Sequence, residues 1–214
     1  MIFQDNSGHI SGKFWDATEN DIAQFKAGEV VQLSGKRELY QGNPQIKIYS
    51  MRLATQEEGN DPRTFVERAP EAPNAMEEEL NSFIFEITNA NWNRIVRKLI
   101  QDHKKAFFSY PAAKSNHHAF AGGLAFHTLS ILRLAKNVVA QYSSLNKSLL
   151  YAGAILHDLG KTIELSGPIS TEYTVPGNLI GHIVLIDEQI VLAAHQLKID
   201  INSEDMLLLS LIHI

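Results

Sequence analysis

Residues 149–161 read LLYAGAILHDLGK, an apolar stretch that ends in the pair His157-Asp158 and continues into Gly160 and Lys161. The stretch predicts an apolar helix, and Gly160 then lets the chain break away from it. An imidazole and a neighbouring carboxylate that emerge at the end of one helix can turn toward a single point. These two groups suit divalent ions such as Mn²⁺, Fe²⁺, Co²⁺ or Zn²⁺.

A second histidine, His127, lies in the stretch GGLAFHTLSILRLA. Leu124, Ile131 and Leu134 mark an apolar helix face beside it, so His127 should point inward. A buried imidazole needs a polar partner. A lone inward histidine is more often hydrogen-bonded within a core, but the HDLGK segment thirty residues further on favours a metal ligand here.

Two further residues extend this candidate site. His182, in NLIGHIVL, follows a glycine inside an apolar run and is a candidate ligand for a second metal ion, with a core histidine as the alternative. Lys161 can reach a bound phosphate as a point charge. The HD dipeptide alone recurs by chance, so the prediction depends on these partners.

Composition limits the classes of protein that fit. The chain has 214 residues, a net charge of −5 and no cysteine, which excludes disulfides and thiolate metal sites. No apolar run is long enough to cross a membrane and no secretory signal is visible, so we expect a cytoplasmic enzyme. Residues 83–136 carry eight basic and two acidic side chains. A basic approach to a metal site suits a polyanionic substrate, although a solvated helix face explains the same pattern.

The chain begins with a β-rich segment and continues as helices. Strands are predicted over 9–16, 29–39 and 45–53, with turns at DNSG and YQGNP, and a short helix over 18–26. Helices are predicted over 76–88, 91–106, 117–140, 146–157, 178–196 and 203–212.

These elements predict an α+β chain with several parts. A module over 1–54 precedes a linker over 55–75, which is rich in proline and acidic residues, and an all-α domain over 76–214. The chain starts in a strand and stops in a helix, so we expect a fragment that is truncated at the C-terminus.

The contexts GGLAFHTLS, AGAILHDLGK and GHI resemble the HD-domain phosphohydrolase superfamily. With FFSYPAAKSNHHAFAGGLAFHT before them and a β-rich module at the start, the chain is similar to the YhaM family of bacterial 3′→5′ exoribonucleases. The resemblance runs from about residue 2 to about residue 209. It implies a partial OB-fold β-barrel followed by an all-α HD domain.

The resemblance also implies roles for individual residues. His127, His157 and Asp158 match the core metal ligands, and His182 matches the extra histidine where two metals bind. One or two divalent ions are expected, with Mn²⁺ favoured and Co²⁺, Fe²⁺, Mg²⁺ or Zn²⁺ as alternatives. Asp158 and Lys161 are the expected catalytic residues. The family's later His-His pair and Asp are not recognisable here. Without that Asp the core site would lack one ligand, so this chain could be inactive even though the longer protein is an enzyme.

The N-terminal module would bind nucleic acid. An OB-fold has five strands, and residues 1–54 supply three or four, so the first strand is expected to be missing. Aromatic side chains that stack on bases and cations that follow phosphates are the expected contacts. These candidates are Trp15, Lys36, Arg37, Tyr40, Lys47 and Tyr49. His117 and His118 are candidate contacts for substrate phosphate, with a surface pair at a helix start as the alternative.

The predicted function is metal-dependent 3′→5′ hydrolysis of single-stranded RNA, and of single-stranded DNA as a further possible substrate, to nucleoside monophosphates. Two alternatives stay open at this point. One is an HD phosphohydrolase that acts on nucleotides or cyclic dinucleotides. The other is a nucleic-acid-binding protein whose HD domain is only scaffold. No membrane partner is expected, and the sequence leaves the oligomeric state open.

Overall fold

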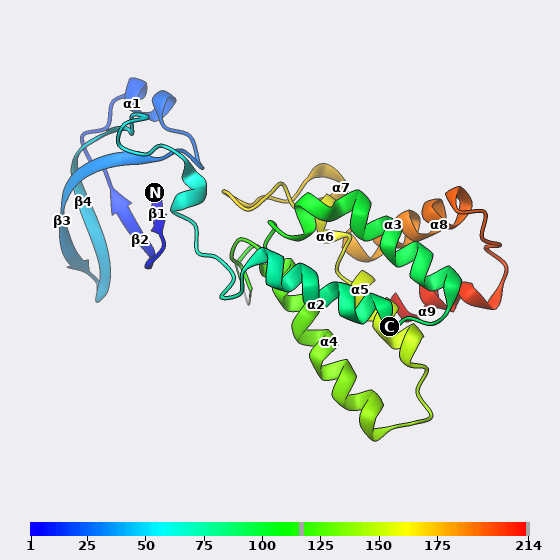
Figure 1. Ribbon diagram of the computed structural model, residues 1–214. Coiled ribbons are helices and arrows are strands. Elements are labelled where there is room, and N and C mark those ends of the chain that lie inside the picture. The colour runs from blue at the N-terminus through cyan, green and yellow to red at the C-terminus, as the bar shows by residue number, and fades with distance from the viewer. Residues whose placement is uncertain (116–117, 213–214) are drawn as a thin grey trace. The chain divides into compact units, whose positions relative to one another are not determined.

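The α+β architecture expected from the sequence is present, with a small sheet followed by helices (Figure 1). The structure is a computed structural model that describes residues 1–115 and 118–212. It divides into two compact units, Met1–Arg68 and Ala69–Ile214, which we call the strand unit and the helical unit. Their boundary falls inside the range 55–75, where the sequence predicts a linker.

The strand unit contains four strands in the order β1-β2-β4-β3 and one α-helix. In chain order its elements are β1 (Ile2–Asp5), β2 (Gly8–Lys13), α1 (Glu19–Gln24), β3 (Val31–Tyr40), β4 (Asn43–Leu53) and a 3-10 turn (Pro62–Thr64). Both predicted turns are confirmed, since short turns join β1 to β2 and β3 to β4 in antiparallel pairs. Gln41 and Gly42 have φ values of 52° and 82°, as the turns that suit β-hairpins require.

The middle of the sheet combines two kinds of pairing. Strand β2 runs parallel to β4, and β3 runs antiparallel to β4. In this register Lys47 of β4 lies opposite Lys13 of β2 on one side and opposite Lys36 of β3 on the other. Because directly paired residues point to the same side of a sheet, the three lysines form one row on one face.

The helical unit is built from eight α-helices within the described residues. They are α2 (Pro73–Phe85), α3 (Ala90–Phe107), α4 (Gly123–Gln141), α5 (Lys147–Leu156), α6 (Lys161–Glu164), α7 (Val175–Leu179), α8 (His182–Gln196) and α9 (Leu207–Ile212). Capping side chains just before two helices accept hydrogen bonds from free backbone N–H groups of the first turn. Asn89 caps α3 and Asn146 caps α5 in this way. Among residues 1–115 and 118–212, no helix is long and apolar enough to cross a bilayer.

The hydrophobic core lies in the helical unit, and α5 runs through its centre. This helix packs against α4, α3 and α9, and Tyr151, Ala152 and Ile155 on it are at most 1% exposed. The helix is apolar all round because it has neighbours on every side. Its final residues therefore reach the interior of the unit, and the chain delivers His157 and Asp158 there.

Two predicted helix starts were wrong, and glycine explains both. Helix α4 begins at Gly123 instead of 117, because Gly122 has a left-handed φ of 78°. The helix predicted from residue 178 is divided into α7 and α8 by Gly181, with a φ of 82°. The second break makes His182 the first residue of α8.

Candidate metal centre

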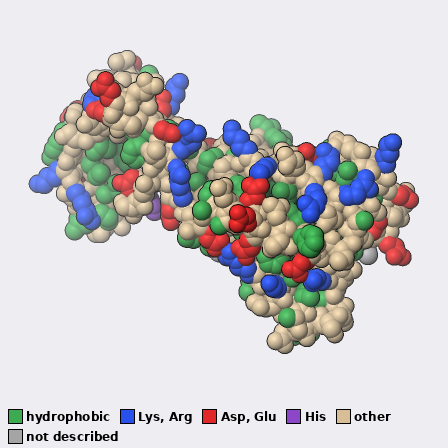
Figure 2. All heavy atoms as spheres, viewed as in Figure 1, with side chains coloured by type: hydrophobic (Ala, Val, Ile, Leu, Met, Phe, Trp, Pro, Cys, Tyr) green, Lys and Arg blue, Asp and Glu red, His purple; other side chains and the backbone are tan. Residues whose placement is uncertain are grey.

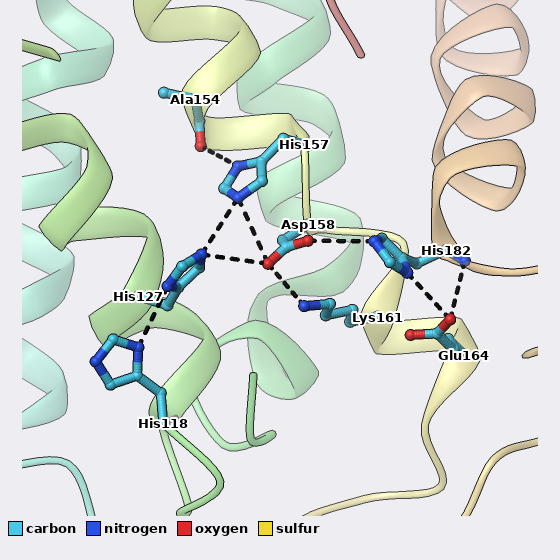
Figure 3. A network of polar contacts seen from close by, with 8 residues as sticks. All are labelled: His118, His127, Ala154, His157, Asp158, Lys161, Glu164 and His182. Carbon is cyan, nitrogen blue, oxygen red and sulfur yellow. Dashed lines mark hydrogen bonds and ion pairs between the residues drawn. The ribbon is translucent and has the colours of Figure 1, made fainter. Parts of the chain in front are cut away.

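Four helices contribute the side chains of the candidate site. His127 lies in the second turn of α4. His157 follows the last residue of α5 and Asp158 comes next, while Lys161 begins α6 and His182 begins α8. Figure 3 shows the histidine rings pointing toward the Asp158 carboxylate from separate elements. The ligands that the sequence predicts thus come together in space.

Glycines allow these elements to approach closely. A Cβ atom on Gly160 would lie 2.1 Å from the His182 carbonyl oxygen, and one on Gly123 would lie 2.0 Å from the His118 carbonyl oxygen. Gly160 has a right-handed φ of −58°. The expectation that Gly160 serves to break the helix was therefore wrong: its lack of a side chain is needed for contact with α8.

Asp158 is the centre of the cluster, and its side chain is 8% exposed. Its Oδ2 atom lies 3.4 Å from His157 Nε2 and 3.5 Å from His127 Nε2. Its Oδ1 atom lies 3.4 Å from His182 Nε2. The Lys161 ammonium donates to Oδ2 at 2.8 Å. The carboxylate therefore lies between two histidines on one side and a third on the other.

The outward nitrogen of each ring has its own partner. His157 Nδ1 donates to the Ala154 carbonyl oxygen at 2.8 Å, and His182 Nδ1 donates to Glu164 Oε1 at 3.0 Å. His127 Nδ1 lies 3.2 Å from His118 Nδ1. Since a carbonyl and a carboxylate only accept, His157 and His182 carry a proton on Nδ1. With Nδ1 protonated in this way, Nε2 of each ring is the nitrogen that faces Asp158 and is the one available to bind a metal ion once it carries no proton.

Charges in the site follow from burial and close partners. Burial raises the pKa of Asp158, but the hydrogen bond and charge of His157, together with Lys161, outweigh it and hold that pKa well below its usual range. Burial lowers the pKa of His157, while the bond to Asp158 overcomes this and leaves the pKa raised. Burial lowers the pKa of His127. At neutral pH the carboxylate is ionised and His127 is neutral, the forms that bind metal.

The donor set fits a divalent cation. One ligand atom from each of His127, His157 and Asp158 lies within 4.8 Å of the others. His127 Nε2 and His157 Nε2 are 3.4 Å apart. Two ligands held about 2.0–2.2 Å from one ion at angles between 90° and 109° would be separated by about 2.8–3.6 Å. The distances among the three atoms agree with that range, and an ion would balance the facing lone pairs.

Other predicted residues lie in different positions. His182 is outside the three-residue group and faces the second oxygen of Asp158. His118 contacts His127, and His117 lies outside the described residues.

Sequence reasoning missed Glu164, which accepts from both the ring and the backbone N–H of His182. An acidic residue between Ile163 and Leu165, just after the HD segment, was the available signal.

The six predicted nucleic-acid contacts lie on the strand unit and are exposed. Lys36 and Lys47 belong to the lysine row, and the Lys13 ammonium lies over the rings of Tyr40 and Trp15, at 4.3 and 5.1 Å from their centroids. Figure 2 shows Lys and Arg side chains next to hydrophobic ones on the visible face of this unit.

Two of the six stand apart from this arrangement. Arg37 pairs with Ile46, so it points to the other face of the sheet. Tyr49 lies beside the register shift at Ser34/Gly35 and is 58% exposed.

Comparison with known proteins gave a clear relationship. Proteins named 3′-5′ exoribonuclease YhaM from Listeria monocytogenes serotype 4b, Listeria innocua and Listeria welshimeri are 47%, 46% and 46% identical to the chain over 200 residues. The chain is a YhaM homologue. The match covers 94% of the chain and 64% of each of these YhaM proteins. The chain thus spans less than two thirds of their length, and the resemblance to the YhaM family predicted from motifs is confirmed.

No protein-family model matches the chain. No solved structure matches it.

Proposed function

We propose that this chain is the metal-dependent hydrolytic part of a 3′→5′ exoribonuclease, which releases nucleoside monophosphates from single-stranded RNA and can accept single-stranded DNA. The convergence of His127, His157 and Asp158 within 4.8 Å carries the proposal. The name of the homologous YhaM proteins supports RNA as the substrate and hydrolysis as the reaction. We further propose that the helical unit is an HD domain located in the cytoplasm, in keeping with a chain that contains no cysteine.

The metal site would be held by two imidazole nitrogens and one carboxylate oxygen. When bound, a divalent ion would offset the negative charge on phosphoryl oxygens and lower the pKa of a water molecule, so that hydroxide forms more easily. Imidazole and carboxylate ligands suit several divalent ions; we propose Mn²⁺, as the resemblance to the YhaM family implies, with Co²⁺, Fe²⁺, Mg²⁺ and Zn²⁺ as alternatives. His182 Nε2, 3.4 Å from Asp158 Oδ1, is the proposed ligand of a second ion.

The chain's own residues would position and neutralise the substrate. Asp158 is ionised and buried, so it stays an acceptor and can orient a water molecule. Lys161 lies 2.8 Å from Asp158 and is 17% exposed, which leaves its ammonium within reach of a phosphoryl oxygen beside the carboxylate. Its positive charge would stabilise the charge that develops as the phosphodiester bond breaks.

The strand unit would hold the RNA. We propose that it is a partial OB-fold, since its four strands are one fewer than the five of that fold. The row of Lys13, Lys47 and Lys36 can follow a phosphate backbone, and the exposed rings of Trp15 and Tyr40 can stack on bases. Such contacts read little sequence, as a degradative enzyme requires. Tyr49 is a further stacking candidate.

The test is degradation of a 5′-labelled single-stranded RNA by the purified chain with Mn²⁺, compared with Asp158→Asn. We expect stepwise shortening from the 3′ end, release of nucleoside monophosphates, and loss of both in the variant. Equal rates for the two proteins would contradict the site. Hydrolysis of free or cyclic nucleotides with intact RNA would favour a nucleotide phosphohydrolase. RNA binding with no bound metal and no hydrolysis would favour a non-catalytic binding protein.

A further inference from the structure

The backbone around His118 is held in an unusual conformation. Its φ is 58°, in the left-handed region that few residues other than glycine adopt. The His118 carbonyl oxygen accepts from the Ala112 N–H at 3.0 Å and lies against Gly123, where a Cβ atom would come within 2.0 Å. Strained backbone of this kind persists where surrounding contacts determine it, and it is concentrated at functional sites.

The His118 ring is also held from the side. The rings of Phe120 and Phe126 meet it edge to face, with centroids 5.8 and 5.1 Å away. These contacts aim Nδ1 of His118 at Nδ1 of His127, 3.2 Å distant, and Figure 3 shows the two rings meeting on the side of His127 that faces away from Asp158. The imidazole is therefore placed behind a proposed metal ligand.

The direction of this hydrogen bond follows from the metal site. His127 Nε2 faces His157 and Asp158 and must keep its lone pair to bind a cation. The ring proton of neutral His127 then lies on Nδ1, and His118 Nδ1 accepts it. This arrangement matches the acceptors behind the other two histidines, a backbone carbonyl for His157 and Glu164 for His182.

We infer that His118 is a positioning residue that accepts the Nδ1 proton of His127, so that His127 presents Nε2 to the metal. The inference rests on the proposed metal site and deepens it. It uses only Nδ1 of His118, and the expected contact of His118 with substrate phosphate stays a prediction. Partners that orient a ligand histidine typically raise metal affinity 10–100-fold.

The test uses two variants of the full chain that both tolerate the left-handed backbone. His118→Gly removes the ring and relaxes the strain. His118→Asn places an amide oxygen, an acceptor, at the position of Nδ1, and asparagine is common at such φ values. Mn²⁺ binding is measured by titration calorimetry after metal removal, and unfolding of the metal-free proteins is recorded to compare their folding.

We expect His118→Gly to bind Mn²⁺ about 10–100-fold more weakly than the wild type, and His118→Asn to stay within a few fold of the wild type. Equal affinity for wild type and His118→Gly would overturn the inference and leave the metal site standing. Equal weakening in both variants would also overturn it, because it would show that loss of the ring alone matters. A wild-type chain that binds no Mn²⁺ would overturn the proposed site and with it the inference.

Discussion

The two units place their functional side chains in opposite ways. In the helical unit, side chains from α4, α5 and α8 converge on Asp158, which is 8% exposed, and His157 and His182 each have an acceptor behind the ring. In the strand unit, the candidate contacts are exposed, and Lys36 and Lys47 lie side by side on one face of the sheet, with their order set by strand pairing. One arrangement concentrates charge at a point, and the other distributes charge along a surface.

This difference indicates a division of labour. A buried carboxylate surrounded by imidazoles suits strong binding of a small, highly charged ion. A row of lysines at the surface with aromatic neighbours suits weak, additive contacts to a long polymer. A single substitution should therefore have a large effect in the helical unit and a small one in the strand unit.

The largest effect is expected for Asp158→Asn. The substitution keeps the shape of the side chain but removes the charge that faces all three histidines, so the affinity for Mn²⁺ should fall more than the roughly 10–100-fold typical of outer partners. Calorimetric titration measures it. Asp102→Asn, which alters an exposed ion pair with Lys98 in the same unit, should leave the affinity unchanged. Similar affinities for the two variants would show that Asp158 is not a ligand.

A smaller effect is expected for Gly160→Ala. The added Cβ atom would meet the His182 carbonyl oxygen at 2.1 Å, so α6 and α8 must separate. We expect a loss of about 3 kcal/mol in the free energy of unfolding, at the upper end of overpacking costs. Gly122→Ala is the matched control, since its φ of 78° lies in the left-handed α region but an added Cβ atom would meet no atom closer than 3.4 Å, and it should cost about 1–2 kcal/mol. Urea unfolding compares them, and equal losses would contradict the close contact.

In the metal-free chain, the contributions of His157 and His127 to the free energy of unfolding should change with pH in opposite directions. The pKa of His157 is raised, so its contribution to stability is complete below the unfolded value of about 6.5 and is lost as the pH rises through the folded pKa. The pKa of His127 is lowered, so its contribution is lost as the pH falls.

Urea unfolding of the wild type, His157→Gln and His127→Gln from pH 5 to 8, with a chelator present, measures both slopes. The stability difference between the wild type and His157→Gln should shrink as the pH rises. The difference between the wild type and His127→Gln should shrink as the pH falls. Slopes of the same sign would contradict the arrangement around Asp158.

The smallest effect is expected in the strand unit. Lys47→Ala removes the middle of the lysine row, and Arg37→Ala removes the same charge from the opposite face. Binding of single-stranded RNA, measured by fluorescence anisotropy at several salt concentrations, should weaken a few fold for Lys47→Ala. Its salt dependence, as the slope of log K against log [salt], should fall by about 0.7. Arg37→Ala should match the wild type. Equal losses would show that the RNA does not lie on one face.

Local signals predicted much of this molecule. The helix that ends in His157-Asp158 and the inward direction of His127 follow from apolar periodicity, which depends on nearby residues alone. The function of Gly160 did not follow, because its contact partner His182 is far away in the sequence. The acceptor function of Glu164 was missed for the same reason.

In the strand unit, period-two alternation predicted the strands but not their neighbours. The lysine row depends on the parallel pairing of β2 with β4, two segments that are separated by a helix and another strand. No local pattern in either strand specifies that pairing. The same limit applies to His118, whose ring meets His127 because Gly122 turns the chain before α4 and Gly123 leaves room for the His118 carbonyl oxygen.

The central claim is that His127, His157 and Asp158 bind one divalent ion together. Anomalous diffraction from crystals of the chain grown with Mn²⁺ tests it most directly. We expect an anomalous peak about 2.0–2.3 Å from His127 Nε2, His157 Nε2 and Asp158 Oδ2. A manganese ion bound elsewhere, or crystals at saturating Mn²⁺ with no peak among these three side chains, would contradict the claim.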